Sequence, residues 1–140
     1  MQKPKILPDG IVIPSSTEYL STVDSYVEEA LARAGIDESV IADIAISVSE
    51  LVNNAIKHGN KADIAKTVEV RLSITTGELK ITVLDQGNGF NIDAVPDPID
   101  DQNLMREVGR GIFIIKSFVD ELNISRGPQG GTCVEIVKKR

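Results

Sequence analysis

The sequence predicts an α+β fold, a two-layer sandwich in which a mixed or antiparallel sheet packs on helices. Hydrophobic residues recur every three to four positions in an early segment and every two positions later, and the helical and strand segments are largely segregated along the chain. The content of 41% hydrophobic and 26% charged residues is typical of a globular protein. We expect the 140 residues to form a single domain, 1–140, with a substantial core.

The N-terminal half predicts one short strand and two helices. A β-branched run at 11–13 predicts the strand, and the hydroxyl residues after it offer N-caps for a helix over about 18–34. A second helix is expected over about 37–58, and a glycine follows each helix. The second helix carries an amphipathic stripe that indicates packing on a core: Ile41, Ile44, Val48, Leu51, Val52 and Ala55.

The hydrophobic period then changes to two. Alternation over 68–74 and 79–83, with a turn between them, predicts an antiparallel hairpin with one buried face. A second hairpin is expected to begin at Leu122, to turn through Gly-Pro-Gln-Gly at 127–130 and to return as the strand TCVEIV.

A long connection separates the two hairpins. Residues 91–108 contain two prolines, five acidic residues and little periodicity, which predicts a loop or lid. A helix is expected after it, over about 111–119. Gly109, Arg110 and Gly111 would then lie at the start of this helix, where backbone N–H groups can face a phosphate. A lone Gly-x-Gly is weak evidence for such a site.

Charge and cysteine content exclude several classes of function. The formal net charge of −6 argues against binding to nucleic acid or to an anionic membrane. A single cysteine, Cys133, excludes an intrachain disulfide and a cysteine-rich metal site. We see neither an apolar run of about 20 residues nor a leader sequence, and so expect a cytoplasmic protein.

An aspartate follows the strand at 79–83 and is itself followed by Gly-x-Gly, in the stretch LDQGNGF. Asp85 shares the parity of Leu79, Ile81 and Val83, so it should point into the layer between sheet and helices. Alternatively, the strand ends at Leu84 and the carboxylate turns out to solvent. Thr132 shares the parity of the core residues on its own strand, so its hydroxyl and the Asp85 carboxylate could converge on one cavity for a polar heterocycle.

Two polar residues of the second helix lie four positions apart on one face, beside the apolar stripe. The amide oxygen of Asn54 could coordinate Mg²⁺ without adding charge, and the carboxylate of Glu50 could orient or deprotonate a nucleophile. The alternative is a solvated helix face.

Four motifs follow one another along the chain: ELVNNAIKHGNK, LDQGNGF, VGRGIFIIKSFVDEL and GGTCVEI. They resemble the N, G1, G2 and G3 boxes of the Bergerat-fold ATP-binding superfamily, which contains gyrase, heat-shock chaperones, histidine kinases and MutL-type ATPases. More narrowly, the chain resembles the small anti-sigma-factor serine/threonine kinases of bacterial partner-switching systems.

The resemblance implies a site for ATP and Mg²⁺. Asp85 would receive the adenine amino group, Asn54 would coordinate Mg²⁺, and Glu50 would activate the hydroxyl that is phosphorylated. The remaining implied nucleotide-binding positions shape the adenine pocket or close the lid over the phosphates: Gly87, Gly89, Gly109, Arg110, Gly111 and Thr132. The implied reaction moves the ATP γ-phosphate to a serine or threonine of an anti-anti-sigma protein, and the implied partners are that protein, a sigma factor and a second copy of the chain.

Two other functions are consistent with the same motifs. One is a switch protein that binds ATP and a partner but transfers nothing, and Glu50 argues against it because pure binding needs no carboxylate there. The other is the detached catalytic domain of a histidine kinase. That predicts a helical dimerisation segment with a phosphorylatable histidine, yet the only histidine, His58, lies in the first of the four motifs.

Overall fold

The computed structural model describes residues 3–87, 103–128 and 130–140. Within them, six strands form one sheet in the order β1-β2-β3-β4-β6-β5, and every neighbouring pair is antiparallel. The predicted α+β sandwich is confirmed. The strands are β1 (Lys5–Leu7), β2 (Gly10–Pro14), β3 (Thr67–Ile74), β4 (Glu78–Leu84), β5 (Glu121–Arg126) and β6 (Thr132–Lys139).

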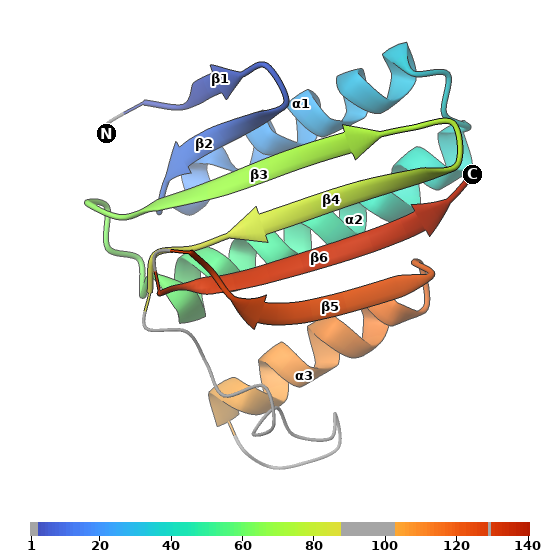
Figure 1. The fold of residues 1–140 in the computed structure, drawn as a ribbon. Helices are drawn as coiled ribbons and strands as arrows, with labels where there is room; N and C mark the ends of the chain where they lie inside the picture. The colour runs from blue at the N-terminus through green and yellow to red at the C-terminus, as the bar shows by residue number, and fades with distance from the viewer. Residues whose placement is uncertain (1–2, 88–102, 129) are drawn as a thin grey trace.

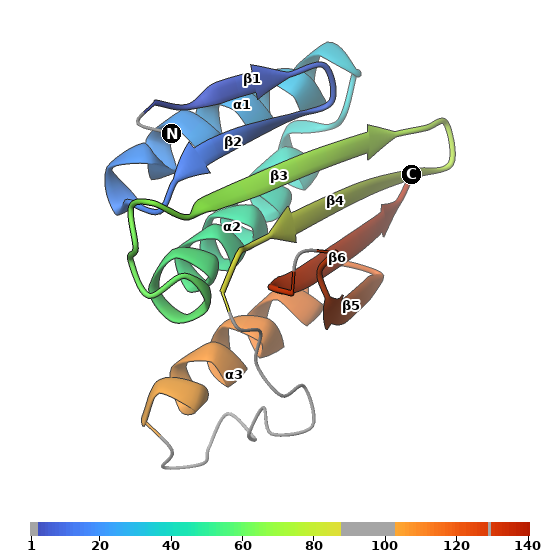
Figure 2. The ribbon, with the colours of Figure 1, turned by 60° about the vertical axis from the view of Figure 1, so that its left-hand side comes forward.

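The helices form the second layer, behind the sheet in Figure 1. A 3-10 turn, Thr17–Tyr19, leads into α1 (Leu20–Arg33), and α2 (Glu38–Asn54) continues into a π-helical turn, Ala55–Gly59. The third helix is α3 (Asn103–Lys116). Figures 1 and 2 show α2 in the middle of this layer, with α1 on the side of β1 and β2 and α3 on the side of β5. The two N-terminal helices therefore form about where the sequence predicts them.

The core lies between α2 and the sheet. Strand register aligns one inward-facing apolar residue from each of five strands in a single row: Ile11, Val70, Val83, Val134 and Ile124. From the other layer, Ile44, Val48 and Val52 are at most 1% exposed. These three positions are spaced four residues apart and so occupy one face of α2.

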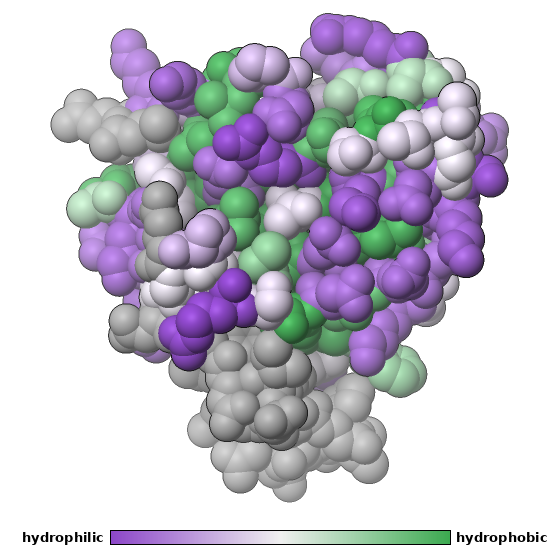
Figure 3. Space-filling view, in the orientation of Figure 1, coloured by the Kyte–Doolittle hydropathy of each residue, from purple (hydrophilic) through white to green (hydrophobic). Residues whose placement is uncertain are grey.

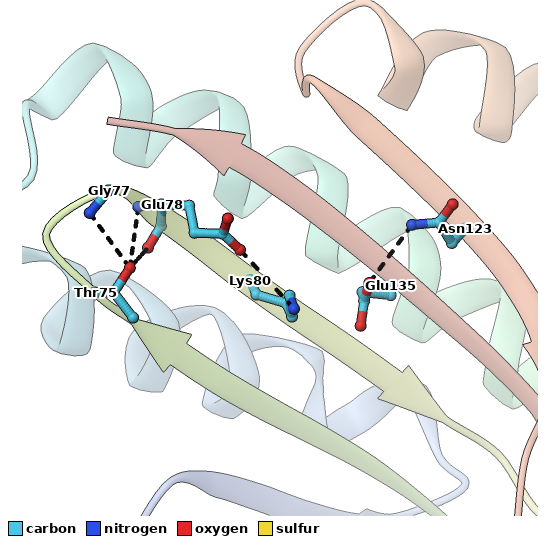
Figure 4. A network of polar contacts seen from close by, with 6 residues as sticks. All are labelled: Thr75, Gly77, Glu78, Lys80, Asn123 and Glu135. Atoms are coloured by element: carbon cyan, nitrogen blue, oxygen red, sulfur yellow. Dashed lines mark hydrogen bonds and ion pairs between the residues drawn. The ribbon is translucent and has the colours of Figure 1, made fainter.

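The other face of the sheet is polar. Figure 3, which views this face, shows mostly hydrophilic residues over the central strands, and Figure 4 shows some of their contacts. Asn123 of β5 donates a 3.5 Å hydrogen bond to Glu135 of β6, and Lys80 lies 3.9 Å from Glu78. The alternation of buried and partly exposed residues along β4 follows from this two-sided environment.

Two predicted boundaries were wrong. The α3 helix begins at Asn103, not near Gly111, so residues 103–108 are helical and only 91–102 of the predicted lid remain, outside the described residues. The run from Asn103 contains Leu, Met, Arg and Glu, which favour helix, and the cost of about 1 kcal/mol for each internal glycine is not enough to end it.

The strand β1 was not predicted, because its three mostly exposed residues show no hydrophobic periodicity.

One helical stretch among the described residues, Glu38–Gly59, has the length and composition of a membrane span. Core helices of soluble proteins pass the same test, so this is weak evidence. The buried residues of this stretch belong to the core cluster that packs against the sheet.

The two faces of α2 can be compared with a matched pair of substitutions. Ile44 is 1% exposed and Ile46 is 54% exposed on the same helix. We expect Ile44→Ala to lower the free energy of unfolding by about 2–5 kcal/mol, because it leaves a cavity in the core. Ile46→Ala should change it by no more than about 0.5 kcal/mol. Urea denaturation of both variants measures the difference, and equal losses would contradict the assignment of the buried face.

Candidate functional site

Asp85 lies one residue beyond β4 and continues its pairing with β6. Its backbone N–H donates to the carbonyl of Thr132 (3.1 Å), so the two residues lie opposite each other with the parity of the core row at Val83 and Val134. Asp85 is 8% exposed and Thr132 is 3% exposed. The predicted inward orientation of both residues is confirmed, and a carboxylate and a hydroxyl take the place of two core side chains at this end of the sheet.

The buried carboxylate is held by backbone groups. Its Oδ1 accepts hydrogen bonds from the N–H of Gly87 and the N–H of Thr132, both at 3.0 Å. Burial raises the pKa of Asp85 above the usual aspartate value, and these two hydrogen bonds and the charge of Lys66 oppose that effect only in part. Among the described residues, Oδ2 has no such donor and is the oxygen left for a ligand.

Three glycines allow the backbone to approach this carboxylate. A Cβ on Gly59 would overlap Asp85 Oδ2, and one on Gly131 would overlap the Asp85 carbonyl. A Cβ on Gly87 would overlap the carbonyl of Gly59. The end of the π-helical turn, the segment after β4 and the segment before β6 therefore meet around one side chain, and each needs a residue without a Cβ.

Asn60 connects the same segments through its buried amide. Its Nδ2 donates to Ser15 Oγ (2.8 Å) and to the Thr67 carbonyl (2.9 Å), and its Oδ1 accepts from the Gln86 N–H (2.8 Å). The next two residues have left-handed φ values of 53° and 58°, which cost roughly 1–2 kcal/mol per non-glycine residue. The amide thus holds a strained turn and the residue that follows Asp85 in one arrangement.

Three buried side-chain oxygens have no hydrogen-bond partner among the described residues, and two of them belong to predicted site residues: Asn54 Oδ1 and Thr132 Oγ1. Leaving such an atom unpaired costs about 1–3 kcal/mol, so each is a place where a ligand can supply the partner. Asn54 lies at the end of α2, five residues before the Gly59 that contacts Asp85. The donor set fits a magnesium nucleotide, with a carboxylate and a hydroxyl for the base and a neutral amide oxygen for the metal.

Glu50 lies one turn before Asn54 on α2 and packs on α3. A Cβ on Gly111 would overlap Glu50 Oε1, so this glycine lets the two helices meet at the carboxylate. Gly109 and Gly111 are buried and Arg110 is exposed, and all three lie inside α3. The predicted position of this triplet at a helix start was therefore wrong, because its N–H groups fall within the helical hydrogen-bond pattern and do not face out at the first turn.

The structure brings the predicted residues Glu50 and Gly111 together, and likewise Asp85, Gly87 and Thr132. Gly89 lies outside the described residues. The sequence pattern gave Gly59 only the role of the residue that follows a helix, gave Gly131 no role beyond the fourth motif, and gave Asn60 none. The triplet His-Gly-Asn at 58–60, at the end of a long amphipathic helix, was the available signal for Gly59 and Asn60.

Asn60 can be tested by removing its amide. Asn60→Ala leaves the Ser15 hydroxyl, the Thr67 carbonyl and the Gln86 N–H without their buried partner. We expect the free energy of unfolding to fall by about 2–4 kcal/mol. Asn123→Ala is the matched control, because its amide is exposed on the polar sheet face, and it should cost less than about 0.5 kcal/mol in the same urea titration. Similar losses would show that the Asn60 network is not a structural tie.

The raised pKa of Asp85 predicts a pH dependence of stability. A carboxyl whose pKa is higher in the folded than in the unfolded state stabilises the fold below its unfolded pKa, and that contribution is lost as pH rises through the folded value. Asp85→Asn removes the titrating group. The unfolding free energy of the unmodified protein minus that of the variant should therefore fall as pH rises from about 4. A difference that rises with pH would show that the two N–H donors outweigh burial.

Comparison with known proteins places this geometry in a family. Residues 13–138 match the family model of the histidine kinase-like ATPase domain. Serine-protein kinase RsbW of Staphylococcus epidermidis is 31% identical over 133 residues, which cover 90% of this chain and 82% of that protein. Serine-protein kinase RsbW of Staphylococcus aureus matches with the same identity and coverage.

Solved structures of related domains have a similar fold. The crystal structure of the RsbU and RsbW domains of a Mycobacterium tuberculosis protein superposes with a TM-score of 0.66 and 26% identity, over 91% of this chain and 31% of that one. The histidine kinase domain of a blue-light activated histidine kinase from Erythrobacter litoralis gives a TM-score of 0.58 and 27% identity, over 90% of this chain and 61% of that one. This chain belongs to the histidine kinase-like ATPase domain family and, within it, to the serine-protein kinases of the RsbW type.

Proposed function

We propose that this protein is an anti-sigma factor that phosphorylates a small anti-anti-sigma protein on serine or threonine, with ATP as the donor. The family uses ATP, and the relatives are serine-protein kinases. The observation that carries the proposal is the side chain of Asn54, whose buried Oδ1 has no partner among the described residues and lies one helical turn from the Glu50 carboxylate.

Asp85 selects the base. Its Oδ1 already accepts hydrogen bonds from two backbone N–H groups, so Oδ2 accepts a hydrogen bond from the exocyclic amino group of adenine. A guanine ring would present a carbonyl oxygen at the same place, and two acceptors would face each other in a buried site, which costs free energy. The Thr132 hydroxyl can donate to a ring nitrogen or accept from a water. Gly87 and Gly89 line the same pocket in this proposal.

Asn54 contributes one neutral ligand to Mg²⁺. The described residues contain no group of three or more His, Cys, Asp or Glu side chains able to hold a metal. The ion would therefore take its other ligands from phosphate oxygens and water, which is the usual arrangement for Mg²⁺. Bound there, Mg²⁺ neutralises charge on the phosphates.

Glu50 accepts the proton of the attacking hydroxyl. As the new bond forms between the serine or threonine oxygen and the γ-phosphorus, the bond from that phosphorus to the β–γ bridging oxygen breaks, and ADP leaves with the electron pair. The close approach of Gly111 fixes the Glu50 carboxylate between α2 and α3. The remaining catalytic contribution is the positioning of the two substrates.

Arg110 is the member of the glycine-rich triplet that we assign to the phosphates, through its exposed guanidinium. Gly111 allows α3 to lie close to α2 beside it, and Gly109 is assigned to the same part of the site in this proposal. Sigma-factor binding, a homodimer and a cytoplasmic location are the remaining parts of the proposal, as the resemblance to the anti-sigma-factor kinases implies.

Two substitutions on α2 should fail in different ways. Asn54→Ala should weaken Mg·ATP binding, because the metal loses a fixed oxygen ligand. Glu50→Gln should leave ATP binding nearly unchanged and slow phosphotransfer roughly a hundredfold or more, because the base is lost. The assays are calorimetric titration with Mg·ATP and transfer of labelled γ-phosphate to the purified anti-anti-sigma protein.

Glu38→Gln is the matched control, since Glu38 is an exposed carboxylate in the first turn of the same helix, and it should leave both assays unchanged. A normal transfer rate for Glu50→Gln would mean that the base lies elsewhere. If the unmodified protein binds ATP and its partners but labels no serine or threonine, it is a non-catalytic ATP-dependent switch.

A further inference from the structure

A groove lies on the helix layer where α1, α2 and α3 meet. Its volume is about 550 Å³, which is room for several side chains and far more than one ion needs. One face of α2 lines it, with residues at the spacing of successive turns: Ala42, Ala45, Ile46, Ser49 and Glu50. The groove therefore reaches from the middle of α2 to the carboxylate that we assign as the catalytic base.

The groove exposes large apolar side chains on both sides. Ile46 of α2 is 54% exposed and Ile114 of α3 is 50% exposed, and both line it. Phe113, next to Ile114 in sequence, is 65% exposed. Single exposed apolar residues are common, but two that face one groove from different helices form a surface that a partner can cover.

The charge of the groove has one sign. Asp24 and Glu28 of α1 and Glu50 of α2 line it, and none of the described residues that line it is basic. Asp24 Oδ1 is buried without a hydrogen-bond partner among the described residues. Desolvation, and then the neighbouring charge of Glu28, raise the pKa of Asp24. A cationic side chain placed between these carboxylates would give Asp24 Oδ1 a hydrogen-bond partner and would offset the repulsion between the two negative charges.

These features identify the occupant. Any hydroxyl that reaches Glu50 belongs to a chain that lies over or in this groove, because Glu50 is part of its wall. The acceptor protein must bring its serine or threonine there, whereas a sigma factor has no need to reach the base. Charge complementarity and the exposed isoleucines then describe the segment around the acceptor hydroxyl.

We propose that this groove docks the phosphorylated protein through a basic side chain between Asp24 and Glu28 and an aliphatic side chain between Ile46 and Ile114. The inference rests on the proposed function, since it takes Glu50 as the base for the transfer. It assigns substrate recognition to residues outside the nucleotide site, so the affinity for the acceptor and the affinity for ATP should be separable.

The test measures steady-state KM values for the acceptor and for ATP, with the purified anti-anti-sigma protein as acceptor. Asp24→Lys combined with Glu28→Lys should raise the KM for the acceptor about tenfold or more, because like charges then meet across the interface. Ile46→Glu should have a similar effect, because it puts a charge on the apolar contact. Unchanged KM values for ATP show that both variants are folded and bind nucleotide.

Two matched controls lie outside the groove. Glu29→Lys makes the same kind of charge reversal on α1, where Glu29 is exposed and its pair with Arg33 contributes little. Ile64→Glu changes an isoleucine of nearly equal exposure, 53%, in the segment between α2 and β3. Both controls should leave both KM values unchanged.

Charge rescue identifies the contact. Substituting glutamate for the basic residues near the acceptor serine or threonine, one at a time, should give one acceptor that the Asp24→Lys, Glu28→Lys protein phosphorylates with a restored KM. Normal acceptor KM values in the groove variants would overturn the proposal, and so would equal losses in the controls. Loss of sigma-factor binding alone would assign the groove to the sigma factor. Absence of transfer by the unmodified protein would instead overturn the proposed function.

Discussion

A buried carboxylate at the end of β4 is the constraint on which the site depends. An unpaired charge in an apolar layer costs several kcal/mol, so the fold must supply hydrogen bonds to Asp85. Two backbone N–H groups do so at 3.0 Å, one from the segment after β4 and one from the first residue of β6. Neither segment could come this close if Gly87 or Gly131 carried a Cβ. The conformation of the pocket wall is thus a consequence of stabilising one side chain.

The helix α2 connects this pocket to the rest of the molecule because it has two distinct faces. One face, with Ile44, Val48 and Val52, packs on the sheet and anchors the helix. The other carries Ala42, Ile46 and Glu50 into the groove beside α1 and α3, and Asn54 lies one turn beyond Glu50. A helix with 3.6 residues per turn can keep two such faces apart only if core packing fixes its rotation. The same contacts that stabilise the fold therefore set where Glu50, Asn54 and the groove residues point.

Much of the site could be predicted because the underlying rule is periodic. Alternation along β4 and β6 predicted that Asp85 and Thr132 face the core, and the spacing on α2 placed Glu50 and Asn54 on one face. The start of α3 could not be predicted in this way. Glycines at 109 and 111 indicate a boundary by propensity, yet Gly111 is inside the helix, at a position where Glu50 of another element occupies the space that a Cβ would need. Contacts between distant segments outweigh a local cost of about 1 kcal/mol.

The sequence by itself determined the fold class, the two hairpins and the two long helices, since each follows from a repeat of two or of about 3.6 residues along one segment. The same alternation favoured an inward Asp85, and the structure decided between that orientation and a carboxylate turned to solvent. Tertiary structure alone decided what no single segment encodes. Asn60 bonds to groups as far as 45 residues away, Gly59 and Gly131 meet at Asp85, and three helices enclose the groove. These features depend on the three-dimensional arrangement of separate elements, and a local pattern carries no information about which residue another segment will bring beside it.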